Sequence, residues 1–116
     1  MTPEGQVKAA IMEYLAVRHI LAFRMQTGSM VGEYKGKTRL VSFGVPGMAD
    51  ILAFPRVEVE GYCGVKHDEI NPLWIECKAP KKKQSEPQKS FQAQVEGEGH
   101  RYIIARSIED VEAALR

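Results

Sequence analysis

The sequence has few cysteines, no excess charge of either sign and no long hydrophobic run. Its two cysteines, Cys63 and Cys77, cannot form a disulfide framework, and together with His67 they lack the spacing of a zinc site. Lys and Arg total 16 against 15 Asp and Glu, so the net charge of +1 gives no global attraction to nucleic acid, and only a local patch could bind it. No apolar run is long enough to span a bilayer, and the opening residues lack the pattern of a signal peptide. These absences favour a cytoplasmic protein without membrane contact.

What is present suits one globular domain over residues 1–116, in which 44% of the residues are hydrophobic and 27% are charged. The apolar periodicity predicts an α/β domain in the order helix, three or four strands, helix, strand, helix. We expect helices over 3–15, 86–95 and 108–115, with N-caps at Thr2, Ser85 and Ser107, the last paired with Asp110. We expect strands over 20–25, 38–43, 48–54, 73–79 and 102–105, a loop over 27–37, and a hairpin extension or surface loop over 56–71.

The segment Leu73–Ala79 is an apolar strand that contains two charged residues. Because side chains alternate along a strand, Glu76 and Lys78 project from one face and the apolar residues from the other. Burying a carboxylate or an ammonium is costly unless the group is paired or meets a ligand. Three interpretations are open at this point: a structural salt bridge, an edge strand with one wet face, or a catalytic carboxylate with a lysine beside it.

A second carboxylate, Asp50, lies near the start of another apolar strand, 26 residues before Glu76. If the two strands pair, Asp50, Glu76 and the backbone carbonyl of Cys77 form an oxygen ligand set with Lys78 beside it. Such sets suit Mg²⁺ or Mn²⁺, which keep several waters that phosphate oxygens can replace. An ion of this kind can polarise a phosphodiester and lower the pKa of a bound water, which Lys78 could orient or deprotonate.

Two further polar residues have both a structural and a functional interpretation. Glu4 falls on the apolar stripe of the first helix, where it is either a first-turn residue favoured by the helix dipole or a carboxylate directed into the domain. Gln88 lies three residues after Ser85, so it either completes a capping box or positions water or a phosphate oxygen. Periodicity alone favours the structural interpretation of Glu4.

Four segments follow one another in an informative order: GVPGMADIL at 44–52, WIECKAP at 74–80, SEPQKSF at 85–91 and GHRYIIARS at 99–107. Together with the early Glu4 they resemble the motifs of the VRR-NUC domain, the virus-type replication-repair nuclease branch of the PD-(D/E)XK superfamily. The resemblance implies a restriction-endonuclease-like fold, in which helices flank a central mixed β-sheet in the order αβββαβα. It favours site roles for Glu4 and Gln88.

The resemblance also implies a nuclease that depends on Mg²⁺ or Mn²⁺. Its catalytic residues would be Asp50, Glu76, Lys78 and Gln88, and Glu4 would join Asp50, Glu76 and the Cys77 carbonyl as a metal ligand. Stand-alone domains of this size resemble Holliday-junction resolvases of bacteriophages and bacteria. We therefore expect a homodimer that cuts branched DNA in a bacterium or in the bacterial host of a phage.

A basic run, Lys81, Lys82 and Lys83, directly follows the charged strand. Such runs are usually solvated, but here contact with DNA phosphates is a reasonable hypothesis, to which Lys35 and Arg39 could contribute. The chain departs from the family pattern at Ala49, where proline is common, at Cys77, where valine is commoner, and in the length of 56–71, which leaves the dimer surface open. Two other functions remain: a non-catalytic DNA-binding or scaffold module on this fold, and a nuclease for flaps, single strands or RNA.

Overall fold

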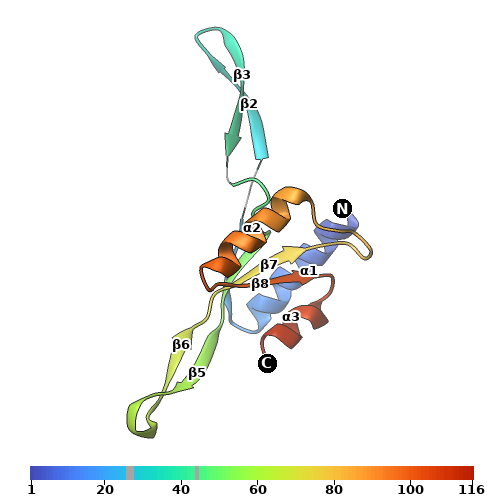
Figure 1. The fold of residues 1–116 in the computed structure, drawn as a ribbon. Helices are drawn as coiled ribbons and strands as arrows, with labels where there is room; N and C mark the ends of the chain where they lie inside the picture. Colours follow the sequence, from blue (N-terminus) through green and yellow to red (C-terminus); the bar gives the residue numbers. More distant parts are fainter. Residues whose placement is uncertain (26–27, 44) are drawn as a thin grey trace.

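The computed structural model describes residues 1–25, 28–43 and 45–116, with side chains for all of these except 28–34 and 39–43. It contains three helices and eight strands in these parts of the chain, with one short 3₁₀ turn (Figure 1). In chain order the elements are α1 (Pro3–Val17), β1 (Leu21–Arg24), β2 (Gly28–Tyr34), β3 (Lys37–Phe43), β4 (Ile51–Phe54), β5 (Arg56–Glu60), η1 (Tyr62–Gly64), β6 (Lys66–Ile70), β7 (Leu73–Cys77), α2 (Glu86–Gly97), β8 (Arg101–Ala105) and α3 (Ile108–Ala114).

Four strands form the central sheet in the order β1-β4-β7-β8. β4 runs antiparallel to both β1 and β7, whereas β7 and β8 are parallel. A parallel pair needs a crossover connection, and α2 supplies it between β7 and β8. The expected α/β domain with a mixed sheet and flanking helices is therefore confirmed.

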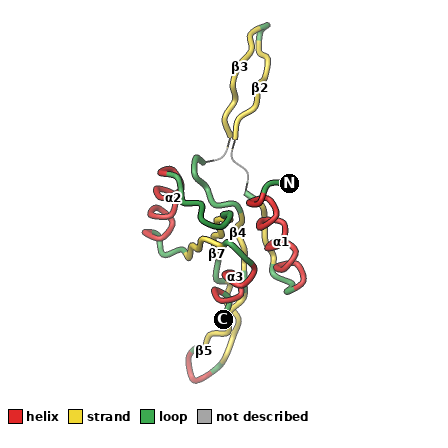
Figure 2. Tube along the Cα trace, turned by 90° about the vertical axis from the view of Figure 1, so that its right-hand side faces the viewer, coloured by secondary structure: helices red, strands yellow, loops and turns green. Residues whose placement is uncertain are grey.

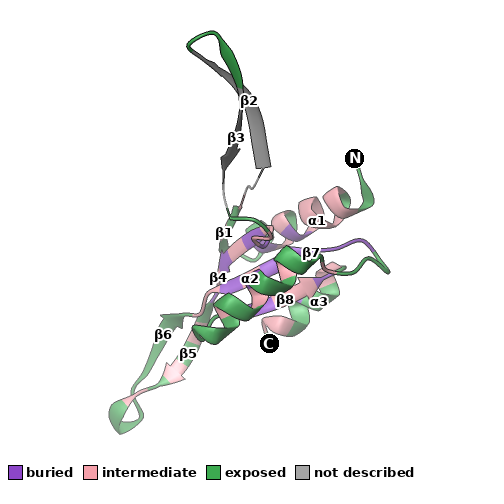
Figure 3. Ribbon diagram, turned by 45° about the horizontal axis from the view of Figure 1, so that its top comes forward, coloured by how far each residue is buried: buried purple, intermediate pink, exposed green. Residues whose placement is uncertain are grey.

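The helices cover both faces of this sheet, with α1 and α2 on opposite sides of β4 and β7 (Figure 2). Side chains of Leu73, Ile75 and Cys77 pack with Ile11 of α1 and Val111 of α3 in the larger core cluster. On the other face, Phe91 of α2 packs with Trp74 and Tyr102, and the Trp74 and Phe91 rings meet edge to face at 5.1 Å between centroids. The expected alternation along the 73–79 strand is thus confirmed for Leu73, Ile75 and Cys77, which share one apolar face of the sheet. The buried positions of the sheet concentrate in β4, β7 and β8 (Figure 3).

Two antiparallel hairpins, β2–β3 and β5–β6, project from this body (Figure 1). They extend the molecule to 65 × 30 × 26 Å and give a radius of gyration of 17.2 Å, against about 13 Å for a compact chain of this length. Of the two alternatives expected for 56–71, a hairpin extension or a surface loop, the structure has the hairpin, β5–β6. The loop expected over 27–37 is wrong, because β2 occupies most of it; Thr27 lies outside the described residues.

The strand expected over 38–43 exists as β3, but it pairs with β2 rather than with the central sheet. The turn of this hairpin explains the error. Lys35 and Gly36 both have positive φ, 52° and 74°, as a two-residue turn that reverses a β-hairpin requires. A lysine in the first of these positions is an uncommon choice, so the sequence contained no strong hairpin pattern.

The N-caps of α1 and α2 are confirmed. Thr2 Oγ1 accepts a hydrogen bond from the Gly5 amide, and Ser85 and Gln88 form the expected reciprocal capping box. Ser107 is the N-cap residue of the last helix, as expected, but its side chain makes no capping bond, and Asp110 accepts from the Arg106 amide instead. Among the helices in the described parts of the chain, none is long and apolar enough to cross a membrane.

Candidate active site

Strand pairing brings Asp50 and Glu76 together. Asp50 immediately precedes β4, and Glu76 is the penultimate residue of β7. The two strands pair with Ile51 opposite Ile75, so both carboxylates lie at the same end of the ladder. A backbone bond fixes the arrangement, because the amide of Cys77 donates to Oδ2 of Asp50 at 2.8 Å. Asp50 and Lys78 were expected inside their strands, and the structure places both just outside them.

The turn before Asp50 is locked against α2 by a glycine. Gly47 has a φ of +77°, and a Cβ atom there would lie 2.2 Å from the backbone of Pro87 in the first turn of α2. Only glycine tolerates both the left-handed conformation and this close approach. The turn that contains Gly47 therefore also joins the segment that carries Asp50 to the helix that carries Gln88.

Glu76 is the most unusual group in the site. Its side chain is 1% exposed, and its Oε1 atom is buried without a hydrogen-bond partner. Burial raises the pKa of Glu76 to about 9, and a shared hydrogen bond with Asp50 and the Asp50 charge add to the shift against the opposing charge of Lys78. Glu76 is thus protonated at neutral pH.

The pKa of Asp50 is shifted in the opposite direction. Burial by itself raises its pKa, but hydrogen bonds from the Glu76 carboxyl, the Cys77 amide and the Lys8 ammonium outweigh burial. The pKa of Asp50 therefore lies below its ordinary value of 3.8. The two carboxyl groups share one proton, and that proton resides on Glu76.

Lys8 is a site residue that the sequence analysis missed. Its Nζ lies 3.1 Å from Oδ1 of Asp50, and the two side chains are 28% and 19% exposed. Lys8 follows Glu4 by four residues, so both lie on one face of α1. That spacing, with the interpretation of Glu4 as a carboxylate directed into the domain, could have identified Lys8.

Glu4 also reaches the site. Its Oε1 lies 3.8 Å from Nζ of Lys78, whose side chain is 11% exposed. One face of α1 therefore offers a carboxylate to the lysine of the site and a lysine to its aspartate. These two ion pairs neutralise the charged groups of the site across the helix–sheet boundary.

A cavity of about 350 Å³ opens beside this pair, and Glu4, Lys78, Lys82 and Lys83 contribute to its lining. The guanidinium of Arg106 holds the lysine run in place by donating to the carbonyl of Lys82 at 2.7 Å. The structure thus brings Lys82 and Lys83 next to Lys78. Lys81, with a φ of +69°, is exposed and does not line the cavity.

The remaining expected site residues lie elsewhere or serve other contacts. The Gln88 side chain accepts from the Ser85 amide at 2.8 Å, so its oxygen is used in the capping box. Lys35 lies in the turn of the β2–β3 hairpin, which projects away from the central sheet (Figure 1). The side chain of Arg39 lies outside the described residues.

Within the described residues, no group of three or more His, Cys, Asp and Glu side chains is placed to hold a metal ion. The oxygen set consists of two carboxylates, Asp50 and Glu76, with the Cys77 carbonyl at the end of the same strand. This set fits a hard divalent ion that keeps several waters, because the unpartnered Oε1 of Glu76 and the shared proton mark a place where a cation would relieve repulsion. Comparison with protein-family models, curated proteins and solved structures found no match for the chain.

Proposed function

We propose that this protein is a divalent-metal-dependent endonuclease that hydrolyses phosphodiester bonds in branched DNA, a stand-alone VRR-NUC domain of the PD-(D/E)XK superfamily. One observation carries the proposal: Glu76 is buried with an unpartnered Oε1 beside Asp50 at the end of adjacent strands, with Lys78 two residues beyond it. Paired carboxylates that cannot both ionise are characteristic of functional sites. A structural role would require no second acid beside Glu76.

The topology supports this proposal. In chain order, the central sheet and its helices consist of α1, the antiparallel strands β1, β4 and β7, the helix α2, and the strand β8, which runs parallel to β7. With the two hairpins taken as insertions, this is the order αβββαβα that the motif resemblance implies. The lysine after β7 and the helix after the lysine run also stand where that resemblance requires them.

Asp50, Glu76 and the carbonyl of Cys77 would hold Mg²⁺ or Mn²⁺. Glu4, which lies beside Lys78, would be an additional ligand at the edge of the site. A bound ion would supply Lewis-acid polarisation of the scissile phosphodiester. Binding requires Glu76 to release its proton and the Lys8 ammonium to leave Oδ1 of Asp50. Lys78 would then direct its ammonium at the negative charge that develops on the phosphate oxygens.

The lysines beside the site support a nucleic-acid substrate. Lys82 and Lys83 line the cavity next to Lys78, so a phosphate in that cavity meets several ammonium groups. Each such contact makes binding dependent on salt. Two active sites are needed to cut two strands of a junction symmetrically, so the proposal includes a homodimer.

A second function is a DNA-binding module without catalysis. The observation in its favour is the Lys8–Asp50 ion pair, which neutralises the aspartate without any metal. This alternative predicts DNA binding that is indifferent to Mg²⁺ and Mn²⁺. It gives no reason for Glu76 to be buried with an unpartnered oxygen.

A cleavage panel separates the two functions. The purified protein is incubated with labelled four-way junction, flap, splayed-arm, single-stranded and linear duplex DNA and with RNA, in Mg²⁺, Mn²⁺ or EDTA. The proposal predicts cleavage of branched DNA in either metal and none in EDTA. Cleavage that survives EDTA contradicts the metal mechanism, and DNA binding without cleavage of any substrate supports the module.

Matched variants test the assigned residues in the same assay. Glu76→Gln and Lys78→Met should each lower the cleavage rate at least a hundredfold while the protein stays folded. The control is Lys37→Met, which removes an exposed lysine of the β2–β3 hairpin that projects away from the central sheet. Wild-type turnover in Glu76→Gln or Lys78→Met would show that the site is misassigned.

A further inference from the structure

The β5–β6 hairpin, residues 56–70 and hereafter the arm, presents an aromatic side chain to solvent at its tip. Tyr62 is 93% exposed, and the neighbouring Val65 is 64% exposed. The tip has a defined conformation, because Gly61 donates to the carbonyl of Val65 at 2.6 Å and η1 bends the chain through positive φ at Cys63 and Gly64. A large aromatic residue held outward on a projecting hairpin is the kind of anchor that buries itself in a partner.

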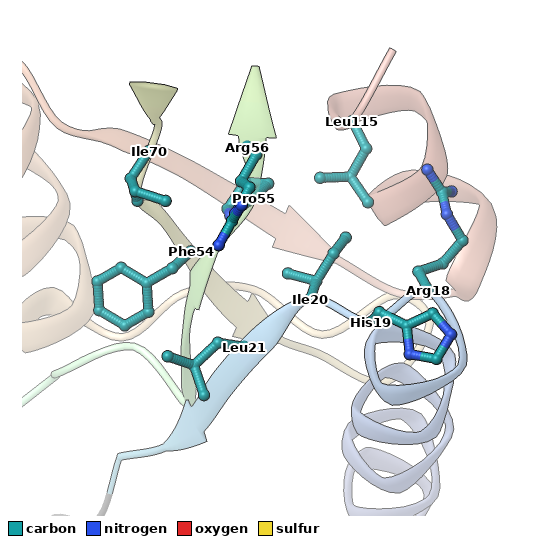
Figure 4. Close-up of a pocket in the computed structure, with 9 residues that line it drawn as sticks. All are labelled: Arg18, His19, Ile20, Leu21, Phe54, Pro55, Arg56, Ile70 and Leu115. Carbon is teal, nitrogen blue, oxygen red and sulfur yellow. The ribbon is translucent and has the colours of Figure 1, made fainter. Parts of the chain in front are cut away.

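A cavity of about 370 Å³ lies at the other end of the arm (Figure 4). Arg56 and Ile70, which pair with each other and close the arm at its base, both line it. Its apolar wall includes Leu21, Phe54 and Leu115, and Arg18 stands at its side. We call this the base cavity. Its apolar wall and two guanidinium groups suit an aromatic side chain that arrives together with carboxylates.

The Arg18 guanidinium is held in position before any partner arrives. Nη1 of Arg18 donates to the Tyr14 hydroxyl at 2.6 Å, and the guanidinium carbon lies 5.6 Å from the centre of the Tyr14 ring. A fixed guanidinium loses little side-chain entropy when it binds a carboxylate.

The arm carries the opposite charge. It contains four acidic residues against two basic ones, with His67 paired to Glu69; the acidic residues are Glu58, Glu60, Asp68 and Glu69 and the basic ones Arg56 and Lys66. Glu60 stands two residues before Tyr62 and has no ion pair within the described part of the chain. An acidic arm is repelled by DNA phosphates, so its tip suits a basic protein surface rather than the nucleic acid.

We propose that the occupant of the base cavity is Tyr62 of a second copy of this chain. Two copies related by a two-fold axis can point their arms in opposite directions, so that the tip of each arm meets the base of the other. The contact is self-complementary, since tip meets base cavity twice, and it brings Glu60 of one copy to the arginines of the other. On the order of 20 residues per protomer would take part, as in interfaces of standard size. This inference gives the homodimer of the proposed function its surface, and it does not depend on nuclease chemistry.

The oligomeric state tests the proposal. Sedimentation of the wild-type protein up to ~100 µM should show a dimer, and Tyr62→Ser should raise the dimer dissociation constant at least tenfold. The control is Val45→Ser, which changes a 49% exposed apolar residue in the loop before Asp50, and it should leave dimerisation unchanged. A monomeric wild type, or equal dissociation constants for wild type and Tyr62→Ser, would overturn the proposal.

Disulfide trapping tests the geometry. Cys63 is exposed at the tip and Cys77 is buried, so Leu21→Cys in the base cavity should give an oxidised dimer linked through Cys63. The wild type should not cross-link, because antiparallel arms keep the two Cys63 residues apart. Tip-to-tip cross-linking of the wild type, or trapping with Gln94→Cys on α2 in place of Leu21→Cys, overturns the arrangement. A dimer that cuts no DNA refutes the nuclease and leaves this interface intact. A monomer that cuts DNA refutes the interface and the homodimer of the proposed function, and leaves the nuclease activity standing.

Discussion

Replacing Glu76 with glutamine should change how stability depends on pH. In the folded protein the pKa of Glu76 is raised to about 9, whereas the unfolded chain has the ordinary value of 4.5. Between these values the folded state holds a proton that the unfolded state has lost. The contribution of Glu76 to stability is therefore fully present below pH 4.5 and is lost as the pH rises toward 9.

The size of the effect follows from linkage. One proton of difference corresponds to a little over 1 kcal/mol per pH unit, so Glu76 should remove about 3 kcal/mol between about pH 6 and pH 8. The lowered pKa of Asp50 acts below 3.8 and does not contribute in this window. A loss of this size is a large part of the 5–15 kcal/mol that holds a small domain together.

Urea unfolding in EDTA at several pH values measures this loss. Glutamine keeps the shape of the side chain and cannot titrate, so Glu76→Gln should lose about 3 kcal/mol less than the wild type over the same interval. Every other residue is common to the two proteins, so the difference between the curves isolates Glu76. Parallel curves for the two proteins would refute the assignment of the shared proton to Glu76.

Two further predictions follow from the contacts around the site. Gly47→Ala should destabilise the protein by more than about 2 kcal/mol, because the new methyl would collide with the backbone of Pro87. Gly97→Ala has open space around it and should stabilise α2 by about 0.5–1 kcal/mol. Thermal and urea unfolding compare the two variants, and equal effects would contradict the close approach of Gly47 to Pro87. Lys8→Met should lower the stability of the metal-free protein and raise its affinity for Mn²⁺ roughly tenfold, because the ammonium and the ion compete for Asp50. Titration calorimetry measures the affinity, and weaker binding of Mn²⁺ by the variant would show that Lys8 assists the ion.

The central part of the fold could be predicted because its patterns are strong. The apolar strand around Ile75 and the capping box at Ser85 each specify one local structure, and both are present. Alternation along β7 also assigned Glu76 to the face opposite Ile75. These features depend on short-range rules that the sequence contains in full.

The hairpins and the network around the carboxylates depend on long-range pairing, which sequence patterns show poorly. β2 contains glycines and lies beside a Lys-Gly turn, so pairing with β3 overrides its weak strand propensity. Lys8 acquires its role only when α1 packs against the sheet and meets Asp50. The proton shared by Asp50 and Glu76 likewise arises from burial, which exists only in the folded chain.

The sequence predicted the members of the site better than their contacts. Asp50, Glu76 and Lys78 lie together, with Glu4 beside the lysine. The Gln88 side chain bonds to Ser85 in the capping box. A catalytic role for Gln88 therefore needs evidence from the rate at which a Gln88→Ala variant cleaves DNA. A rate that falls with Gln88→Ala and not with Ser85→Ala would separate these roles, since both variants break the same cap.

The most direct test of the central claim is Mn²⁺ binding to the metal-free protein, measured by titration calorimetry near pH 8. If Asp50 and Glu76 hold a divalent ion, the wild type should bind Mn²⁺ and release protons, because Glu76 must give up its proton to become a ligand. Glu76→Gln should bind at least tenfold more weakly and release fewer protons. No binding by the wild type, or equal binding and proton release by both proteins, would contradict the account.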